Sequence, residues 1–136
     1  PGVTVGKAAP RLTLVALDGA TVDVPRPDQV TIINFWATWC PPCRGEMPEL
    51  QKFVNDHGAT VAFYAVNLRE PADKVRVFLQ KNGYFLPVLL DGGEAGQIYR
   101  VNAIPTTVII DKDGIVRYRK TGTVTAAELE GAVRGL

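Results

Sequence analysis

The sequence has few of the side chains that bind metals or cross-link small proteins. Its 136 residues include two cysteines, one histidine and one methionine. Two cysteines cannot build the disulfide framework of a small secreted domain. Together with His57 they supply three good soft ligands, one fewer than a structural zinc site requires. A disulfide-stapled scaffold and a zinc module are therefore both excluded.

Long apolar runs and an excess of one charge are missing as well. No stretch approaches the ~18 apolar residues of a membrane-spanning helix. Fifteen basic and fourteen acidic residues give a formal net charge of +1, which argues against nucleic acid or an anionic membrane as a partner. With 46% hydrophobic and 21% charged residues, the chain has the composition of a single globular domain over residues 1–136.

Strand and helix patterns alternate along the chain and predict an α/β fold. Alternating apolar residues on both sides of Asp18-Gly19 indicate an N-terminal hairpin. The β-branched and aromatic residues of 30–36 are typical of a buried central strand. Further strands are predicted at 60–66, 85–90, 106–111 and 115–121, and helices at 41–57, 71–82 and 95–101.

The C-terminal part of the chain completes this prediction. The strands at 106–111 and 115–121 form a hairpin that adds an antiparallel edge, so the central sheet is expected to be mixed and flanked by helices. Thr125 and Glu128 have the spacing of a capping box. The helix that they open is expected to bury Leu129, Ala132 and Val133.

Both cysteines lie in the segment Cys40-Pro41-Pro42-Cys43, between the buried strand and the first helix. This context is typical of a thioredoxin-like redox motif. Only a thiolate attacks a disulfide, and the unpaired amides of a helix N-terminus favour negative charge. Cys40, the outer sulfur, is therefore the predicted nucleophile. Cys43, one turn further in, is the predicted resolving thiol.

The two prolines between the cysteines limit how far the thiolate is stabilised. Proline has no amide hydrogen, so neither Pro41 nor Pro42 donates to the Cys40 sulfur. The nearest backbone donor is then Cys43, and the expected lowering of the Cys40 pKa is modest. A weakly stabilised thiolate disfavours the reduced form, which indicates a reductant rather than an oxidant.

Four stretches of the chain carry a resemblance when taken together. They are 34–48 (Asn-Phe-Trp-Ala-Thr-Trp-Cys-Pro-Pro-Cys-Arg-Gly-Glu-Met-Pro), 6–10 with the following hairpin, Ile104-Pro105-Thr106-Thr107, and an extra helix and strand over about 69–90. The chain thus resembles, over nearly its whole length, the TlpA/ResA-like thioredoxins of the AhpC/TSA-redoxin type. The resemblance implies a thioredoxin fold with an N-terminal hairpin extension and a central helix–strand insert.

The same resemblance implies a function and a setting. The expected activity is extracytoplasmic dithiol–disulfide exchange, often the reduction of apocytochrome c or of metallochaperone cysteines. Protein disulfides are the expected substrates, a membrane thiol protein is the expected electron donor, and a monomer without a cofactor is the expected form. The resemblance implies a periplasmic or membrane-anchored location. The chain begins at Pro1 rather than Met, which is the start expected of a mature or trimmed form, so the absence of a leader or anchor from this sequence does not bear on the location. A cytoplasmic location stays open.

Three further residues acquire roles from the resemblance. Pro105 is expected to carry a cis peptide bond that turns the Ile104 backbone outward, where an extended substrate can pair with it. Glu46 matches a functional acid, which would oppose thiolate formation and pass a proton to the leaving thiol. Its alternative is an early-helix acid that interacts with the dipole. Asn34 replaces the buried acid of ordinary thioredoxins and is more simply interpreted as a hydrogen-bonded buried amide.

The aromatic and basic residues around the motif have less specific interpretations. Trp39, Pro41 and Ile104 form either an apolar docking surface around the reactive sulfur or ordinary packing. Trp36 is expected in the core. Arg44 is expected to face solvent, and His57 is expected to be an exposed cation at the end of the first helix.

Two other functions remain as alternatives. A peroxiredoxin-like peroxidase would use the same fold, although its peroxidatic cysteine stands in a different local motif. A copper-binding or metal-delivery module would bind copper(I) through the thiolates of Cys40 and Cys43. Within redox chemistry, the fold and motif are shared by reductants, oxidants and isomerases.

Overall fold

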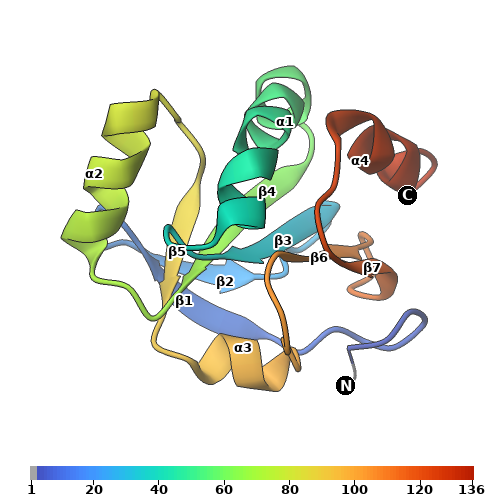
Figure 1. Cartoon of the computed structure of the whole chain (residues 1–136). Coiled ribbons are helices and arrows are strands. Elements are labelled where there is room, and N and C mark those ends of the chain that lie inside the picture. Colours follow the sequence, from blue (N-terminus) through green and yellow to red (C-terminus); the bar gives the residue numbers. More distant parts are fainter. Residues whose placement is uncertain (1–2) are drawn as a thin grey trace.

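The computed structural model describes residues 3–136, and seven strands form one sheet within them. The strands are β1 (Leu12–Ala16), β2 (Thr21–Val24), β3 (Thr31–Trp36), β4 (Ala62–Leu68), β5 (Val88–Asp91), β6 (Thr106–Ile110) and β7 (Val116–Thr121). The helices are α1 (Pro41–His57), α2 (Ala72–Asn82), α3 (Glu94–Ile98) and α4 (Ala126–Val133). Helices α1, α2 and α4 cover one face of the sheet, and α3 covers the other (Figure 1).

The sheet has the order β2-β1-β5-β4-β3-β6-β7 and is mixed, as predicted. Strands β3, β4 and β5 run parallel to one another, whereas β6 and β7 add the antiparallel edge. The N-terminal hairpin β1–β2 is confirmed, and β1 pairs antiparallel with β5. The extra helix and strand predicted over 69–90 are α2 and β5, so this insert supplies the strand that joins the hairpin to the sheet.

Two apolar cores lie on the two faces of the sheet, and β3 contributes to both. Ile32 and Trp36 pack with residues of α1, α2 and α4, whereas Ile33 and Phe35 pack with residues of α3 and β4. Because it is covered on both sides, all six residues of β3 are buried. This burial explains the continuous apolar pattern of the segment and fixes the strand that precedes the cysteines.

Several predicted boundaries shift for local reasons. The strand predicted at 85–90 begins at Val88, directly after Pro87, because proline cannot donate to a strand ladder. The strand predicted at 60–66 starts later and continues to Leu68, because its end pairs with β5. The short helix predicted to end at residue 101 ends at Ile98.

The last helix follows its predicted cap but not its predicted burial. The Thr125 side chain accepts a hydrogen bond from the Glu128 amide, as a capping box requires. Leu129 is fully buried, whereas Ala132 and Val133 are only half-buried. These two residues lie in the final turn of a helix that packs mainly against α1 at the end of the described chain. No helix within residues 3–136 is both long enough and apolar enough to span a membrane.

Candidate active site

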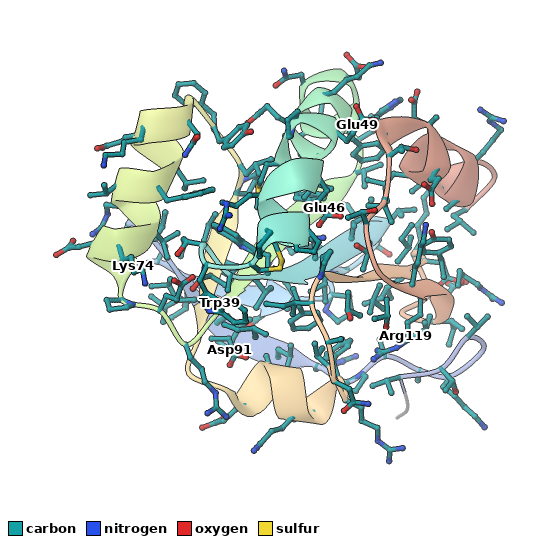
Figure 2. All side chains as sticks on the ribbon, in the orientation of Figure 1. Trp39, Glu46, Glu49, Lys74, Asp91 and Arg119 are labelled. Carbon is teal, nitrogen blue, oxygen red and sulfur yellow. A yellow bond between two sulfur atoms is a disulfide. The ribbon has the colours of Figure 1, made fainter. Side chains whose placement is uncertain are left out.

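Cys40 lies at the point where the buried strand β3 gives way to helix α1. It is the N-cap residue of α1, with an extended backbone at φ −89° and ψ 112°. Its amide donates to the carbonyl of Ala37 at 3.3 Å, which closes the loop after the strand. Cys40 and Cys43 are joined by a disulfide bond. Figure 2 shows this bond at the start of α1, between the side chains of Trp39 and Glu46 in that view.

The helix end presents a single backbone donor to the outer sulfur. The Cys43 amide donates to Cys40 Sγ at 3.3 Å, while Pro41 and Pro42 occupy the first two helical positions. The predicted difference in exposure is present but small, since Cys40 is 3% exposed and Cys43 is fully buried. Of the two cysteines, only Cys40 has any exposed surface.

The loop before β6 lies against Cys40. The Ile104–Pro105 peptide bond is cis, as expected. The Ile104 carbonyl oxygen is 3.7 Å from Cys40 Sγ. Strand β6 pairs with β3 only from Thr106 onward, so within residues 3–136 the amide and carbonyl of Ile104 form no backbone–backbone hydrogen bond. An open backbone unit therefore lies next to the outer sulfur.

A groove opens beside the disulfide, and some of the predicted docking residues line it. It has a volume of about 610 Å³. Trp39, which is 64% exposed, and Ile104 both line it. Pro41 is exposed, but it is not among the lining residues, so only two of the three predicted docking residues meet in this groove.

Glu46 is buried and hydrogen-bonded across the fold. It is 2% exposed, and its carboxylate accepts from Asn34 Nδ2 at 2.8 Å and from the Val124 amide at 3.1 Å. Burial raises the pKa of Glu46, although the hydrogen bonds from Asn34 and Val124 act in the opposite direction. The first turn of α1 contains no acidic residue, so the alternative of an acid that serves only the helix dipole does not describe Glu46.

Asn34 is a hydrogen-bonded buried amide, as expected. Besides Glu46, its Nδ2 contacts Thr107 Oγ1 at 3.1 Å. Its Oδ1 is buried and has no hydrogen-bond partner among the described residues. The amide therefore has an unused acceptor beside a carboxyl group whose pKa burial raises.

Glu70, a half-buried residue whose side chain is only 5% exposed, is a second carboxylate of the site, and the sequence interpretation missed it. It accepts from the Thr38 amide at 2.7 Å and from the Thr38 hydroxyl, from Asn67 Nδ2 at 2.8 Å, and it pairs with Lys74 at 3.4 Å. Burial opposes its ionisation, but these donors together lower the pKa of Glu70. Arg44 completes the arrangement by donating to the Thr38 carbonyl at 3.1 Å.

The Glu70 network holds the loop that leads from β3 to Cys40. Thr38 stands two residues before Cys40 and belongs to a segment that is separated from Glu70 by 32 residues. Strand pairing between β3 and β4 brings the two together. No local pattern shows such a contact, because it depends on which strands are neighbours.

The remaining predicted residues occupy ordinary positions. Trp36 is fully buried, with its ring 5.5 Å from that of Phe78. His57 is less exposed than expected, because it packs on the Phe53 ring at 4.8 Å and its Nε2 lies 3.1 Å from a Glu130 oxygen. Within residues 3–136, no three His, Cys, Asp or Glu side chains cluster in a way that could hold a metal ion.

Comparison with known proteins agrees with this geometry. A family model described as Redoxin matches residues 4–134. Thiol-disulfide oxidoreductase ResA of Geobacillus kaustophilus is 36% identical over 133 residues, which cover 94% of this chain and 75% of that protein. Thiol:disulfide interchange protein DsbE of Allochromatium vinosum is 31% identical over 131 residues, which cover 93% of this chain and 71% of that protein.

A solved structure extends the agreement to the whole fold. The crystal structure of StoA from Bacillus subtilis superposes with a TM-score of 0.84 at 30% identity, and the match covers 94% of this chain and 100% of that one. The chain therefore belongs to the Redoxin family, as a TlpA/ResA-like thiol–disulfide oxidoreductase with a thioredoxin fold.

Proposed function

We propose that the chain reduces disulfide bonds in extracytoplasmic proteins, with Cys40 as the attacking residue and Cys43 as the resolving residue. The observation that carries this proposal is the asymmetry of the two sulfurs. Cys40 Sγ caps the helix and lies 3.7 Å from the open Ile104 carbonyl, whereas Cys43 is fully buried behind it. An incoming disulfide thus meets one sulfur first.

The reaction transfers two electrons from the dithiol to the substrate. The Cys40 thiolate attacks one substrate sulfur, the substrate S–S bond breaks, and a mixed disulfide forms as the first substrate thiolate leaves. Cys43 then loses its proton and attacks Cys40 Sγ. The mixed disulfide breaks, the second substrate thiolate leaves, and the Cys40–Cys43 bond remains. A thiol protein of the membrane returns two electrons to complete the cycle.

Glu46 is the group proposed to accept the Cys43 proton. It lies three residues after Cys43 on α1, and residues at this spacing occupy the same face of a helix. Burial raises the pKa of Glu46, so its carboxylate is a stronger base than an exposed glutamate. The same group then supplies a proton to the leaving substrate thiolate.

The substrate is proposed to bind as an extended segment. It pairs with the open backbone of Ile104, which Pro105 holds toward the sulfur, and it packs against exposed Trp39. The proposed substrates are protein disulfides, including those of apocytochrome c, that lie in an exposed, extended segment. The protein is further proposed to act as a monomer, either in the periplasm or anchored to a membrane on its extracytoplasmic side.

The first experiment is a redox titration of the whole chain in thiol buffers, followed by tryptophan fluorescence. A potential near or below about −220 mV supports a reductant, and one near about −120 mV marks an oxidant. Two variants test the order of attack. Cys43→Ser is expected to accumulate a mixed disulfide with a substrate protein, and Cys40→Ser is expected to accumulate none. The reverse pattern would overturn the assignment.

The alternatives are tested on the same material. Consumption of hydrogen peroxide at enzymatic rates would replace the proposal with a peroxidase. Stoichiometric copper(I) that survives a glutathione wash would replace it with a metal-delivery module.

A further inference from the structure

The groove beside the disulfide differs in charge from the rest of the molecule. Its lining residues are Trp39, Leu68, Arg69, Gly93, Gly96, Gln97, Arg100, Val101, Asn102 and Ile104. They include two arginines and no acidic residue, although the whole chain has a formal net charge of only +1. Positive charge is therefore concentrated where the proposed substrate would pass.

The two arginines have no partners within the fold. No hydrogen bond or ion pair among residues 3–136 uses the guanidinium group of Arg69 or of Arg100. Both residues are exposed. Arg119 does contact Arg100, but through the Arg100 carbonyl oxygen at 3.0 Å, which leaves the Arg100 side chain free.

Both arginines also occupy strained backbone positions. The described chain has three non-glycine residues with positive φ, and two of them are Arg69 at 59° and Arg100 at 52°. Glycine would adopt this conformation without strain. Strained side-chain-bearing residues gather at binding sites, where the side chain is needed. The third such residue, Asp28, does not line this groove.

The carboxylate of Asp91, which holds the loop at the groove wall, is already occupied by backbone amides. Asp91 accepts hydrogen bonds from the amides of Gly93 and Ala95 at 3.0 Å each and from the amide of Gly96 at 2.9 Å. Figure 2 shows Asp91 just before α3, on the Trp39 side of the molecule. Since these amides bind its carboxylate, Asp91 fixes the start of α3 instead of pairing with Arg69.

Arg69 lies flat against this wall. A Cβ atom on Gly93 would come within 2.7 Å of its Nε and Nη2 atoms, so only glycine leaves room for the guanidinium. The Arg69 amide donates to the Asp91 carbonyl at 2.8 Å, which fixes the backbone from which the side chain projects. The groove thus contains a positioned cation without an anion.

We infer that this groove binds an extended substrate segment that carries a carboxylate side chain a few residues from the attacked cysteine, and that Arg69 and Arg100 select it. Trp39 and Ile104 form the end of the groove next to Cys40 Sγ, so a segment attacked there continues toward the two arginines. The inference rests on the proposed function, because it assumes that protein segments are the substrates, and it adds the class of segment that reacts fastest.

The test uses the reduced whole chain and synthetic peptides that each contain one intramolecular disulfide. The peptides differ only in having Glu, Gln or Lys at the positions a few residues from one cysteine. Peptide reduction is followed by chromatography of acid-quenched samples. We expect the Glu peptide to react about tenfold faster than the Lys peptide at low salt, with Gln between them, and the ratio to shrink toward one at about 0.5 M salt.

Two double variants separate the groove from overall charge. Arg69→Gln/Arg100→Gln is expected to reduce the Glu-to-Lys ratio to less than about twofold. Lys52→Gln/Lys81→Gln removes the same charge from exposed positions on α1 and α2, and it is expected to keep the ratio.

The outcomes that overturn the inference are distinct from those that overturn the proposed function. Equal reduction of all three peptides by the unsubstituted protein would remove the charge selection and leave disulfide reduction intact. An equal loss of preference in both double variants would assign the effect to net charge and also overturn it. Failure to reduce any peptide would overturn the proposed function, and the inference with it.

Discussion

At the scale of residues, the side chain of Asn34 connects Glu46 of helix α1 to the sheet. Its Nδ2 donates to Glu46 at 2.8 Å, and its Oδ1 is buried without a partner in the described chain. Rotation of the amide about its terminal bond would exchange donor and acceptor. The Asn34 amide can thus hydrogen-bond to Glu46 whether Glu46 is a carboxylate or a carboxylic acid. This property suits a position beside a glutamate that gains and loses a proton.

Asn34→Asp tests this role, because it places two carboxyl groups in one buried contact. Two carboxylates at such a distance cannot both ionise, so the pair is expected to retain one proton to higher pH than Glu46 alone. A pKa raised in the folded state gives stability that is complete below the unfolded pKa and is lost as pH rises through the folded pKa. We expect the oxidised variant to be nearly as stable as the original protein at pH 4.5, and about 3 kcal/mol less stable at pH 8.

Urea unfolding at the two pH values measures this difference. Asn34→Asp combined with Glu46→Gln serves as the control, because only one carboxyl group then remains and most of the pH dependence should disappear. A loss of stability that is the same at pH 4.5 and pH 8 would show that Asn34→Asp disturbs packing and does not create a shared proton.

The stability that Glu70 contributes is expected to depend on pH in the opposite direction. Although burial opposes its ionisation, donors from Thr38, Asn67 and Lys74 lower the pKa of Glu70. A lowered pKa gives stability that is present above the unfolded pKa and is lost as pH falls through the folded pKa. Glu70→Gln is therefore expected to cost about 1–2 kcal/mol at pH 7 and progressively less below about pH 4.

The matched control for Glu70→Gln is Lys74→Gln, which removes the exposed partner and leaves the Thr38 hydrogen bonds in place. Urea unfolding at pH 7 should show a loss of less than about 0.5 kcal/mol for this control. Equal destabilisation of the two variants would show that Glu70 stabilises the fold through its ion pair with Lys74. The hydrogen bonds to Thr38 would then contribute nothing measurable.

At the scale of elements, the first turn of α1 sets how well the Cys40 thiolate is stabilised. An N-cap side chain accepts from the amides of the second or third helical residue. The third residue, Cys43, donates at 3.3 Å, but the second is Pro42, which has no amide hydrogen. The helix therefore offers one of its two usual donors to the outer sulfur.

Pro42→Ala restores the missing donor and should make the protein more oxidising. We expect the Cys40 pKa to fall by about one unit and the redox potential to rise by about 30 mV, since both correspond to about 1.4 kcal/mol in favour of the thiolate. Thiolate absorbance and a thiol-buffer titration measure the two quantities. Pro41→Ala, at the first helical position, is the control and should change neither by half as much. Equal effects of both substitutions would mean that loss of proline rigidity, and not the amide, is responsible.

The elements also show how much of the molecule local pattern can predict. The buried run of β3, the hairpin β1–β2 and the cap of α4 follow from residue spacing, and all three were predictable. The contact between Glu70 and Thr38 was not, because it requires β4 to lie beside β3. The charge of the groove was not predictable either, since Arg69 and Arg100 lie on separate segments that only the complete sheet brings to one surface.

At the scale of the whole molecule, the insert connects two parts that a smaller sheet would leave separate. Strand β5 pairs in parallel with β4 and antiparallel with β1, where Val15 is opposite Leu90 and Ala16 is opposite Leu89. The loop between β5 and α3 then contributes Gly93 to the groove wall. The insert thus attaches the hairpin to the sheet, and the loop that follows it forms part of the groove wall.

The redox state of the Cys40 and Cys43 sulfurs is expected to change the free energy of unfolding of the whole chain. The sign of that change shows whether the protein is a reductant or an oxidant. Closing a loop with a sequence separation of three restricts the unfolded chain and contributes about 2 kcal/mol to the oxidised form by chain entropy. A strong oxidant reverses this order, because its reduced form is stabilised by a favourable thiolate. With one amide donor at Cys40 Sγ, the thiolate gains too little for such a reversal. We therefore expect the oxidised chain to unfold at higher urea than the dithiol, with a double Cys40→Ser/Cys43→Ser variant insensitive to reductant. A reduced form more stable than the oxidised one would identify the protein as an oxidant and overturn the proposed direction.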